Sequence, residues 1–481
     1  MKRFIALFLS CLLVLSLALT SCGKNDPAKT TKPAETKPAA SDAAPASSAP
    51  AETPAPAVTD DPSVKTFNIY SFTDEVPKML AKYAELHPEF KQQFEVKQTV
   101  ISTSEGQYQP ALDAALQAGG EAAPDLYCAE SAFVLKYTQG DASQYAAAYK
   151  DLGIDIATKI KESEIAQYSV DIGTRGDGSV VGLGYQATGG AFIYRRSIAK
   201  AVWNTEDPAI IKDKIGGSWD NFFKAAEELK AKGYAIVSGD GDIWHPIENS
   251  SDSGWVVDGK LVLDPKREAF IDYSKKLKDG GYHNDTQDWT DPWYADMHDA
   301  GKKKVFGFFG PAWLINYVIV KNCGGEKVGQ GTYGDWAVCE PTVGFFWGGT
   351  WLLANKDTKI PATVGKVIEW ITLDSSDTGL QYFWANGTLN GPGGTKDTVG
   401  SGVVMAKSDG KMDFIGGQNM FEVFVPAGAS ATGKNFTQYD ETINKYFRDQ
   451  VREYTAGKKT RDQAITDFKQ QVADNLEVTV E

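Results

Sequence analysis

Residues 66–80 read TFNIYSFTDEVPKML, and this stretch indicates the fold class. Phe67 and Ile69 alternate with more polar neighbours, as in a strand that buries one face. A polar turn follows at residues 71–75, and Pro77 suits the first turn of a helix. Apolar residues at helical spacing continue the pattern to Leu86. The stretch therefore predicts a strand, a polar turn and a helix in succession.

The same alternation recurs along the chain. Strand patterns at 94–101 and 125–128 are followed by helix patterns at 109–118 and 131–137. Alternating strands and helices are typical of an α/β unit built on a largely parallel sheet. Further patterns predict a strand at 234–238 and helices at 264–278, 361–373, 440–456 and 460–475. The chain after Pro62 is long enough for two such lobes with separate cores.

Residues 1–62 have a different composition. Lys2 and Arg3 precede an apolar run at 4–19, which is followed by Leu19-Thr20-Ser21-Cys22. This resembles a bacterial lipoprotein signal, in which residues 1–21 are removed and Cys22 carries the lipid; an ordinary secretory signal is the alternative. Residues 23–62 are rich in Pro, Ala, Thr and Ser, so we expect residues 22–62 to form a lipidated, disordered tether. The expected location is the extracytoplasmic face of the bacterial membrane.

Charge and cysteine content exclude some functions. The formal net charge is −14, and removal of the two basic residues of the signal makes it more negative. Such a chain is not expected to bind nucleic acid or anionic lipid surfaces. Cys128 is expected to be buried in a strand, whereas a disulfide between Cys323 and Cys339 remains open.

Motifs for catalysis or cofactor binding are mostly absent. The four histidines form no HExxH motif, and there is no zinc-type cysteine pair or G-x-S-x-G elbow. Residues 329–334 fit G-x-G-x-x-G, but a strand-like segment follows where a helix is required. Residues 428–434 resemble a phosphate loop, except that Asn435 replaces the Ser or Thr that binds magnesium. We expect no cofactor and no metal, although the acids of 285–293 leave a calcium site open.

Acidic residues follow two of the predicted strands. Asp74 and Glu75 come after the first strand, and Glu130 closely follows the third. Ligands of parallel α/β sheets bind beyond the carboxyl ends of strands. These side chains are therefore candidate ligand contacts, although Asp74 also suits the start of a helix.

Four of the twelve tryptophans lie in residues 302–355, each close to a Gly or Pro. A flat indole face can stack on the apolar C–H face of a sugar ring, although each ring can equally be a core residue. Trp313 and Trp347 are the favoured candidates of this group. Trp244, in the polar loop after the strand at 234–238, is a further candidate platform.

Taken in order, several segments after Pro62 resemble the extracellular solute-binding proteins of bacterial ABC importers, family 1, to which maltose-binding protein belongs. They are 67–70 (FNIY), 123–127 (APDLY), 184–186 (GYQ) before 192–195 (FIYR), 301–303 (GKK) through 310–313 (GPAW), the Gly-Gly of 348–349 before 351–354 (WLLA), and the final helix pair. Ala312 displaces the tryptophan by one position from the Gly-Pro-Trp of the maltose-binding protein.

The resemblance implies an α/β fold of the two-lobed periplasmic-binding-protein type (class II), with a ligand cleft between lobes. By analogy the first lobe holds 63–185 and 342–385, and the second holds 186–341 and 386–481. Such a monomer captures a mono- or oligosaccharide by hinge closure and delivers it to the transmembrane subunits of an ABC permease, without catalysis. By matching position, the implied ligand-binding residues are Asp74, Glu75, Glu130, Tyr185, Trp244, Trp313, Trp347 and Gln418.

Two alternatives from other classes remain open at this point. A secreted, lipid-anchored glycoside hydrolase needs two carboxylates at a fixed separation, and the 63 acidic residues offer many pairs. A non-catalytic surface adhesin explains the anchor and tether, but it does not explain why aromatic and acidic residues collect where strands end.

Overall fold

The computed structural model describes residues 57–103, 106–389, 394–429 and 431–481. The predicted signal peptide and Cys22 lie outside the described residues, as does most of the predicted tether. Within the described ranges, no helix combines the length and the apolar character needed to cross a bilayer.

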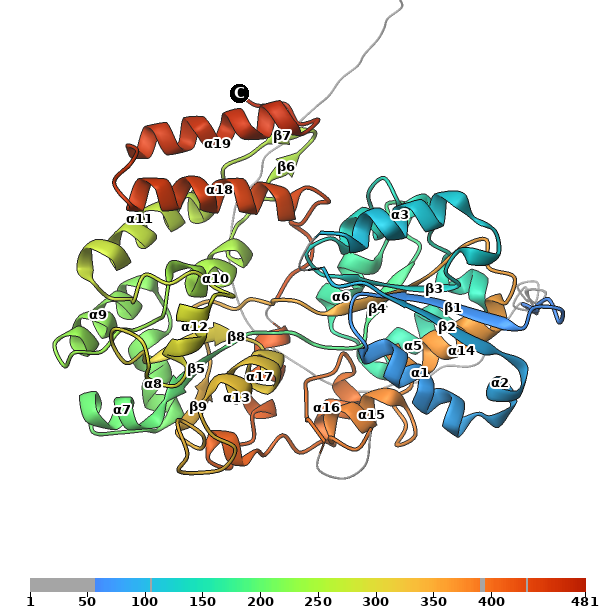
Figure 1. The fold of residues 1–481 in the computed structure, drawn as a ribbon, viewed down its shortest axis with the longest axis horizontal. Coiled ribbons are helices and arrows are strands. Elements are labelled where there is room, and N and C mark those ends of the chain that lie inside the picture. The colour runs from blue at the N-terminus through green and yellow to red at the C-terminus, as the bar shows by residue number, and fades with distance from the viewer. Residues whose placement is uncertain (1–56, 104–105, 390–393, 430) are drawn as a thin grey trace, which may run out of the picture. The chain divides into compact units, whose positions relative to one another are not determined.

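A five-stranded sheet forms the centre of what we call the first lobe (Figure 1). Its order is β2-β1-β3-β10-β4, and β1 lies parallel to both β2 and β3. The predicted alternation of strand and helix is confirmed for these three strands. Strand β10 enters from far along the chain and runs antiparallel to β3 and β4. The bounds are β1 (Thr66–Ser71), β2 (Glu95–Val100), β3 (Leu126–Glu130), β4 (Gly182–Gly184) and β10 (Thr350–Ala354).

Helices cover both faces of this sheet, because its side chains are buried on either side. Phe67 and Ile69 of β1 pack with Met79 of helix α1, whereas Tyr127 of β3 packs with Leu112 of α3. In Figure 1 α3 lies above the sheet, and α1 and α14 lie below it. The helices of this lobe are α1 (Glu75–Leu86), α2 (Pro88–Gln93), α3 (Tyr108–Ala118), α4 (Val134–Thr138), α5 (Ile156–Ser163), α6 (Gln167–Gly173), α14 (Pro361–Thr372) and α15 (Leu380–Ala385).

A three-stranded sheet forms the centre of the second lobe, with β5 (Ala191–Arg195) between β8 (Gly307–Gly310) and β9 (Trp336–Cys339). Both neighbours run antiparallel to β5. The strand predicted at 234–238 is reduced to two parallel bridges, from Ala235 to Val305 and from Val237 to His283. The covering helices include α7 (Arg196–Trp203), α8 (Pro208–Ile215), α9 (Trp219–Lys230), α10 (Trp244–Asn249), α11 (Pro265–Gly280), α12 (Asp291–Asp296), α13 (Val320–Asn322), α17 (Phe421–Ala429), α18 (Asp440–Thr455) and α19 (Arg461–Asn475).

Helix α16 (Gly402–Ala406) packs on first-lobe helices, although the sequence assigned residues 386–481 to the second lobe. It contacts α5 and α15 of that lobe and also α17 of the second lobe. The Ser401 hydroxyl donates a hydrogen bond of 2.8 Å to the Ser163 carbonyl, and Gly400 N–H donates to the Tyr185 carbonyl at 2.8 Å. The segment around α16 therefore contacts both lobes.

The folded part also begins earlier than the predicted end of the tether at Pro62. The carboxylate of Asp60 accepts a hydrogen bond of 2.8 Å from Ala362 N–H and one of 2.6 Å from the Thr363 hydroxyl. Both donors lie in the first turn of α14, where backbone N–H groups lack helical partners. Asp60 therefore ties the start of the folded chain to α14.

The three cysteines of the described residues are all buried and free. Cys128 lies in β3, as expected. The disulfide left open between Cys323 and Cys339 is not formed.

Candidate ligand-binding site

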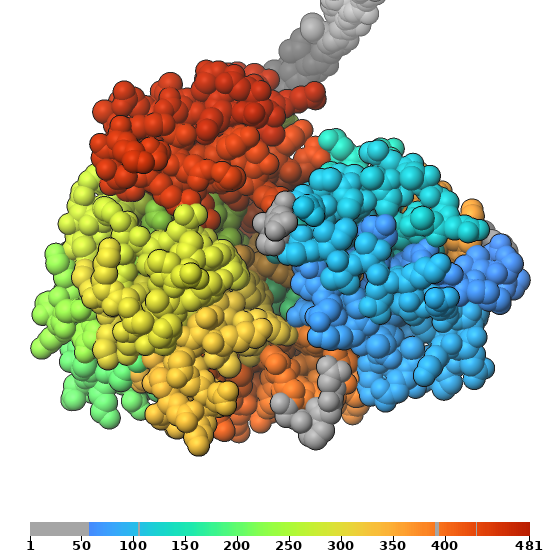
Figure 2. All heavy atoms as spheres, viewed as in Figure 1, coloured from blue at the N-terminus to red at the C-terminus, as the bar shows by residue number. Residues whose placement is uncertain are grey.

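A cavity of about 910 Å³, the main cavity, is lined by residues of both lobes. Residues 72–75 after β1 and Glu130 at the end of β3 line it from the first lobe. Trp289, Trp313 and Tyr317 line it from the second lobe, and residues 347–350 belong to the chain that crosses between the lobes. Figure 2 shows a hollow between the blue and yellow segments on the face viewed. The acidic turns thus lie at the carboxyl ends of parallel strands, as predicted.

Three indole rings form one wall of the main cavity. The centroids of Trp313 and Trp347 are 4.8 Å apart, with ring planes at 67°. Trp289 lies 6.1 Å from Trp313 with nearly parallel planes, at 12°, and 5.8 Å from Trp347. The Trp289 side chain is 49% exposed. The wall therefore offers flat apolar faces to a ligand.

The sequence does not predict Trp289 as a site residue, although it leaves a calcium site open in the same segment. The Trp289 backbone has a φ of 66°, a conformation that a bulky residue rarely adopts and that is often found at functional sites. The segment's acids had suggested calcium, but Asp288 pairs with Arg448 at 2.7 Å and Asp285 pairs with Lys278. Across the described ranges, no group of three or more His, Cys, Asp or Glu side chains is arranged to hold a metal ion.

A Gly-Gly turn lets the crossing chain pass close to the tryptophan wall. Gly348 has a φ of 76°, and a Cβ placed on it would lie 3.1 Å from Nε1 of Trp313. A side chain there would therefore be strained by both the backbone and the contact. The Gly348 carbonyl accepts a hydrogen bond of 2.8 Å from the Thr188 hydroxyl, which holds the turn in place.

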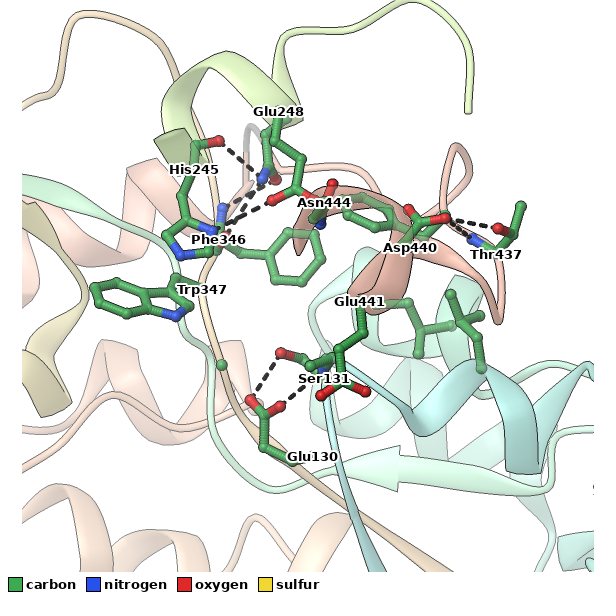
Figure 3. A pocket seen from close by; sticks show the side chains of 16 residues that line it. Glu130, Ser131, His245, Glu248, Phe346, Trp347, Thr437, Asp440, Glu441 and Asn444 are labelled. Atoms are coloured by element: carbon green, nitrogen blue, oxygen red, sulfur yellow. Dashed lines mark hydrogen bonds and ion pairs between the residues drawn. The ribbon is translucent and has the colours of Figure 1, made fainter. Parts of the chain in front are cut away.

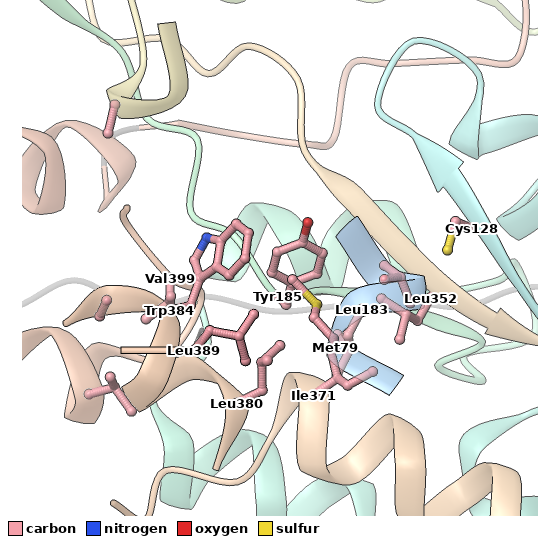
Figure 4. Packing of buried hydrophobic residues seen from close by; sticks show 14 of the residues in the cluster. Met79, Cys128, Leu183, Tyr185, Leu352, Ile371, Leu380, Trp384, Leu389 and Val399 are labelled. Atoms are coloured by element: carbon pink, nitrogen blue, oxygen red, sulfur yellow. The ribbon is translucent and has the colours of Figure 1, made fainter. Parts of the chain in front are cut away.

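Glu75 is an oriented acceptor on the wall of the first lobe. The Tyr185 hydroxyl donates a hydrogen bond of 2.6 Å to its carboxylate. Burial raises the pKa of Glu75, while hydrogen bonds from Tyr185 and Tyr317 act in the opposite direction. The Tyr185 ring is fully buried among apolar side chains, as Figure 4 shows. Tyr185 therefore positions Glu75 and does not itself line the main cavity.

Asp74 and Glu130 also line the main cavity. Asp74 is exposed and pairs with Lys78 at 2.7 Å. Glu130 is half-buried and accepts hydrogen bonds from the Ser131 hydroxyl at 2.9 Å and from Ala132 N–H at 2.8 Å. Burial raises the pKa of Glu130, whereas these hydrogen bonds lower it. Both carboxylates are placed to accept hydrogen bonds from a ligand.

A second cavity of about 100 Å³, the side pocket, adjoins the main cavity (Figure 3). Glu130, Trp347 and Gly348 line both cavities. The Trp347 ring stacks on the His245 ring at 4.4 Å, with planes at 23°. Trp347 therefore lies between the main cavity and the side pocket.

Two predicted site residues serve the framework instead. Trp244 is 1% exposed and packs edge-on against Phe270 at 4.9 Å, because residues 244–249 form α10 and the ring turns into the core. Its predicted role as a stacking platform is wrong. Gln418 accepts a hydrogen bond of 2.9 Å from Val338 N–H and donates one of 2.8 Å to the Val338 carbonyl. Its amide is engaged by β9 rather than aimed at a ligand.

The fold and the shared cleft define a two-lobed binding protein of the periplasmic-binding-protein type. Residues 85–395 match the family model described as bacterial extracellular solute-binding protein, so the chain belongs to that family. Its members bind solutes without catalysis, so the chain is a binding protein and not an enzyme. No curated protein matches the chain.

Solved structures share the fold at low sequence identity. A crystal structure described as extracellular solute-binding protein family 1 has a TM-score of 0.69 at 18% identity and covers 85% of this chain and 99% of its own. The galacto-N-biose-/lacto-N-biose I-binding protein of an ABC transporter from Bifidobacterium longum, solved with lacto-N-biose, has a TM-score of 0.62 at 18% identity, with coverages of 88% and 100%. Maltose-bound MalE3 from T. maritima has a TM-score of 0.59 at 13% identity, with coverages of 86% and 100%.

Proposed function

We propose that the chain captures a mono- or oligosaccharide in the main cavity and delivers it to the transmembrane subunits of an ABC importer. The observation that carries the proposal is the wall of Trp289, Trp313 and Trp347, which shares one cavity with the carboxylates of Glu75 and Glu130. Indole faces suit the apolar faces of sugar rings, and a carboxylate can accept two hydroxyl hydrogen bonds. A space of about 910 Å³ suits a small saccharide. The solved neighbours that bind lacto-N-biose and maltose lend support.

Capture would proceed by hinge closure of the two lobes. We propose a first lobe of 63–185 and 342–385 extended by the segment that carries α16, and a second lobe of 186–341 with the remaining C-terminal residues. The packing of α16 on α5 and α15 supports the extension. We also propose that the protein acts as a monomer.

Calorimetry against a panel of neutral mono- and oligosaccharides at neutral pH tests the proposal. We expect binding of at least one sugar, weakened by Trp313→Ala but not by Trp336→Ala, whose indole is fully buried in the second sheet. Binding of a peptide or polyamine with no response to any sugar would reject the carbohydrate ligand and retain solute capture. No observation favours an adhesin.

We further propose that the chain is exported and held at the extracytoplasmic face of the membrane by a lipid on Cys22. The lipoprotein-like sequence that ends at Cys22 supports this. Cys22→Ala should leave the protein unlipidated and released into the medium, whereas wild type stays with the membrane fraction. Wild-type processing that is insensitive to globomycin would contradict the lipid anchor.

A further inference from the structure

Trp289 is the most exposed ring of the tryptophan wall, and its backbone conformation needs support. The side chain is 49% exposed, and the backbone has a φ of 66°. Such a conformation persists in a bulky residue only where the surrounding structure imposes it. The ring centroids of Trp293 and Trp313 lie 5.6 Å and 6.1 Å from that of Trp289, but these contacts act on the indole and not on the backbone. The residues that flank Trp289 therefore have to supply the constraint.

Asp288, the residue before Trp289, forms an ion pair with α18. Its Oδ1 accepts a hydrogen bond of 2.7 Å from Nη2 of Arg448, and Nη2 of Arg452 lies 3.6 Å from the same oxygen. The Asp288 and Arg448 side chains are 16% and 17% exposed, so salt screens the pair only weakly. Burial acts to raise the pKa of Asp288, but the charge and hydrogen bond of Arg448 and the charge of Arg452 outweigh it and hold that pKa below its ordinary value. The carboxylate is therefore ionised at neutral pH and held by two arginines.

The Arg448 guanidinium is in turn supported by Trp244. Its Cζ lies 5.9 Å from the centroid of the Trp244 ring, within the range of a cation–π contact. The Trp244 ring is buried against Phe270 and Phe447, so its position is set by the core. Although Trp244 is no stacking platform, it is therefore the base of a series of contacts that passes through Arg448 and Asp288 to the wall of the main cavity.

Two glycines of a neighbouring loop leave room for the ion pair. A Cβ placed on Gly241 would lie 2.5 Å from Asp288 Oδ1 and 2.8 Å from Arg448 Nη2, closer than real Cβ atoms approach. A Cβ placed on Gly239 would lie 2.1 Å from the carbonyl oxygen of Thr286. The two glycines therefore allow their loop to pack directly against the segment that carries Asp288, and a methyl group on Gly241 would displace the pair without removing either charge.

We propose that Arg448 is a positioning residue for ligand binding, because it holds Asp288 and, through it, the Trp289 indole at the wall of the main cavity. This inference rests on the proposed function of saccharide capture, since Trp289 belongs to the tryptophan wall. Arg448 itself does not line the main cavity. Loss of the ion pair would release the backbone of Trp289 from its positive φ and turn the ring out of the wall. Affinity therefore depends on an arginine of α18 that no ligand in the main cavity touches.

The fluorescence emission of Trp289 tests the positioning without any ligand. It is obtained as the difference between a chain that carries Trp289 and the same chain with Trp289→Phe, measured once in wild type and once with Arg448→Met. Methionine keeps an apolar side chain over Trp244 but removes the charge. We expect Arg448→Met to shift this emission to longer wavelength and to increase its quenching by acrylamide, whereas Arg448→Lys, which keeps a cation, should restore most of the wild-type signal. An unchanged Trp289 emission in folded Arg448→Met would overturn the proposal.

Matched variants separate the ion pair from a general loss of stability. Arg461→Met also removes an arginine that pairs with two carboxylates, those of Asp272 at 3.1 Å and Glu268 at 3.0 Å, but Arg461 lies on α19 outside the main cavity. It should leave the Trp289 emission unchanged. Gly241→Ala should alter the emission as Arg448→Met does, whereas Gly176→Ala, whose Cβ would meet nothing within 4 Å, should not. Thermal melts identify the folded variants, and where Arg448→Met does not fold, Gly241→Ala decides.

Calorimetry with maltose, cellobiose and lacto-N-biose connects the positioning to binding. Arg448→Met should weaken sugar binding about fivefold, the loss expected for Trp289→Ala, and should add no further loss in a Trp289→Ala background. In the background of Asp74→Asn, which lies on the first-lobe side of the main cavity, the full loss should remain. Additive losses with Trp289→Ala would overturn the route through Trp289. No binding of these sugars or of the wider panel would overturn the carbohydrate proposal, and the Trp289 emission would still decide the positioning.

Discussion

The indole Nε1 of Trp313 donates a hydrogen bond of 2.9 Å to the backbone carbonyl of Trp347. Trp313 follows β8 of the second lobe, whereas Trp347 belongs to the chain that leads into β10 of the first. The bond therefore fixes one aromatic platform against the segment that joins the lobes. The Trp313 indole is thus oriented before a ligand arrives, which lowers the entropy lost on binding.

Trp289 is expected to be a major contributor to affinity. Trp289→Ala should weaken saccharide binding about fivefold or more, because an aromatic contact contributes about 1 kcal/mol beyond its buried area. Its thermal stability should change little, since the ring is 49% exposed. Trp219→Ala is the control, because Trp219 is a half-buried core residue outside the main cavity. Titration calorimetry and thermal melts measure both effects; unchanged affinity in Trp289→Ala would contradict the role.

Tyr185 is expected to act through Glu75. Tyr185→Phe removes a hydrogen bond that lowers the pKa of Glu75, so that pKa should rise further under the effect of burial. If the carboxylate accepts ligand hydroxyl groups, affinity should fall as the pH is lowered, and the midpoint should move to higher pH in the variant. The control is Tyr108→Phe, which removes a 2.6 Å hydrogen bond to the Cys128 carbonyl. A shift of the midpoint in both variants, or in neither, would argue against this coupling.

Gln418 is expected to stabilise the fold without affecting the ligand. Gln418→Ala leaves the N–H and carbonyl of Val338 without their side-chain partners, which should lower the free energy of unfolding by about 1–3 kcal/mol. Gln470→Ala on the exposed side of α19 should have almost no effect. Denaturant unfolding compares the two variants. A loss of ligand affinity in Gln418→Ala, with stability preserved, would restore the role first inferred from sequence.

Asp397 is expected to make stability depend on pH. It is 1% exposed, and burial raises its pKa to about 7, with a further contribution from the charge of Glu75. An unfolded Asp has a pKa of about 3.9, so between these values the folded chain holds a proton that the unfolded chain has lost. The free energy of unfolding should therefore fall as the pH rises through this window, by up to about 1.4 kcal/mol per pH unit.

Asp397→Asn should reduce this slope, since the amide stays neutral throughout. Asp242 and Asp440 have pKa values raised to about 7 by burial and give slopes of the same sign. The difference between wild type and variant isolates Asp397. Denaturant unfolding at several pH values between about 4 and 8 measures it; parallel curves would show that Asp397 is ionised in the folded state.

Local patterns were sufficient to predict the first three strands of the first lobe and several of its helices. Strand β1 and helices α1 and α3 follow from period-two and helical spacing, and the acids after β1 and β3 follow from the rule that ligands bind at strand ends. The final pair, α18 and α19, also appears as predicted. The contacts of helix α16 with α5 and α15 could not be predicted, because they depend on tertiary packing and not on a pattern within residues 402–406.

The sequence was insufficient to predict which tryptophans are buried and which are exposed at the site. In the sequence, Trp244 and Trp289 both have polar neighbours and other aromatic residues nearby, so the local pattern does not distinguish a buried ring from an exposed one. Trp244 is buried because Phe270 and Phe447, from helices far along the chain, close over it. Trp289 has a positive φ and is 49% exposed. Asp285 and Asp288, in the segment that left a calcium site open, pair instead with Lys278 and Arg448.

The pairing of Gln418 with Val338 also has a consequence for self-association. Strand β9 is an edge of its sheet, and an edge offers unpaired backbone groups to any neighbouring chain. The amide of Gln418 occupies both groups of Val338, and the guanidinium of Arg196 occupies the Trp336 carbonyl at 2.9 Å. The side chains of Gln418 and Arg196 thus form hydrogen bonds that a neighbouring strand would otherwise form. At high local concentration, another copy of the chain would therefore not be able to add a strand to the β9 edge.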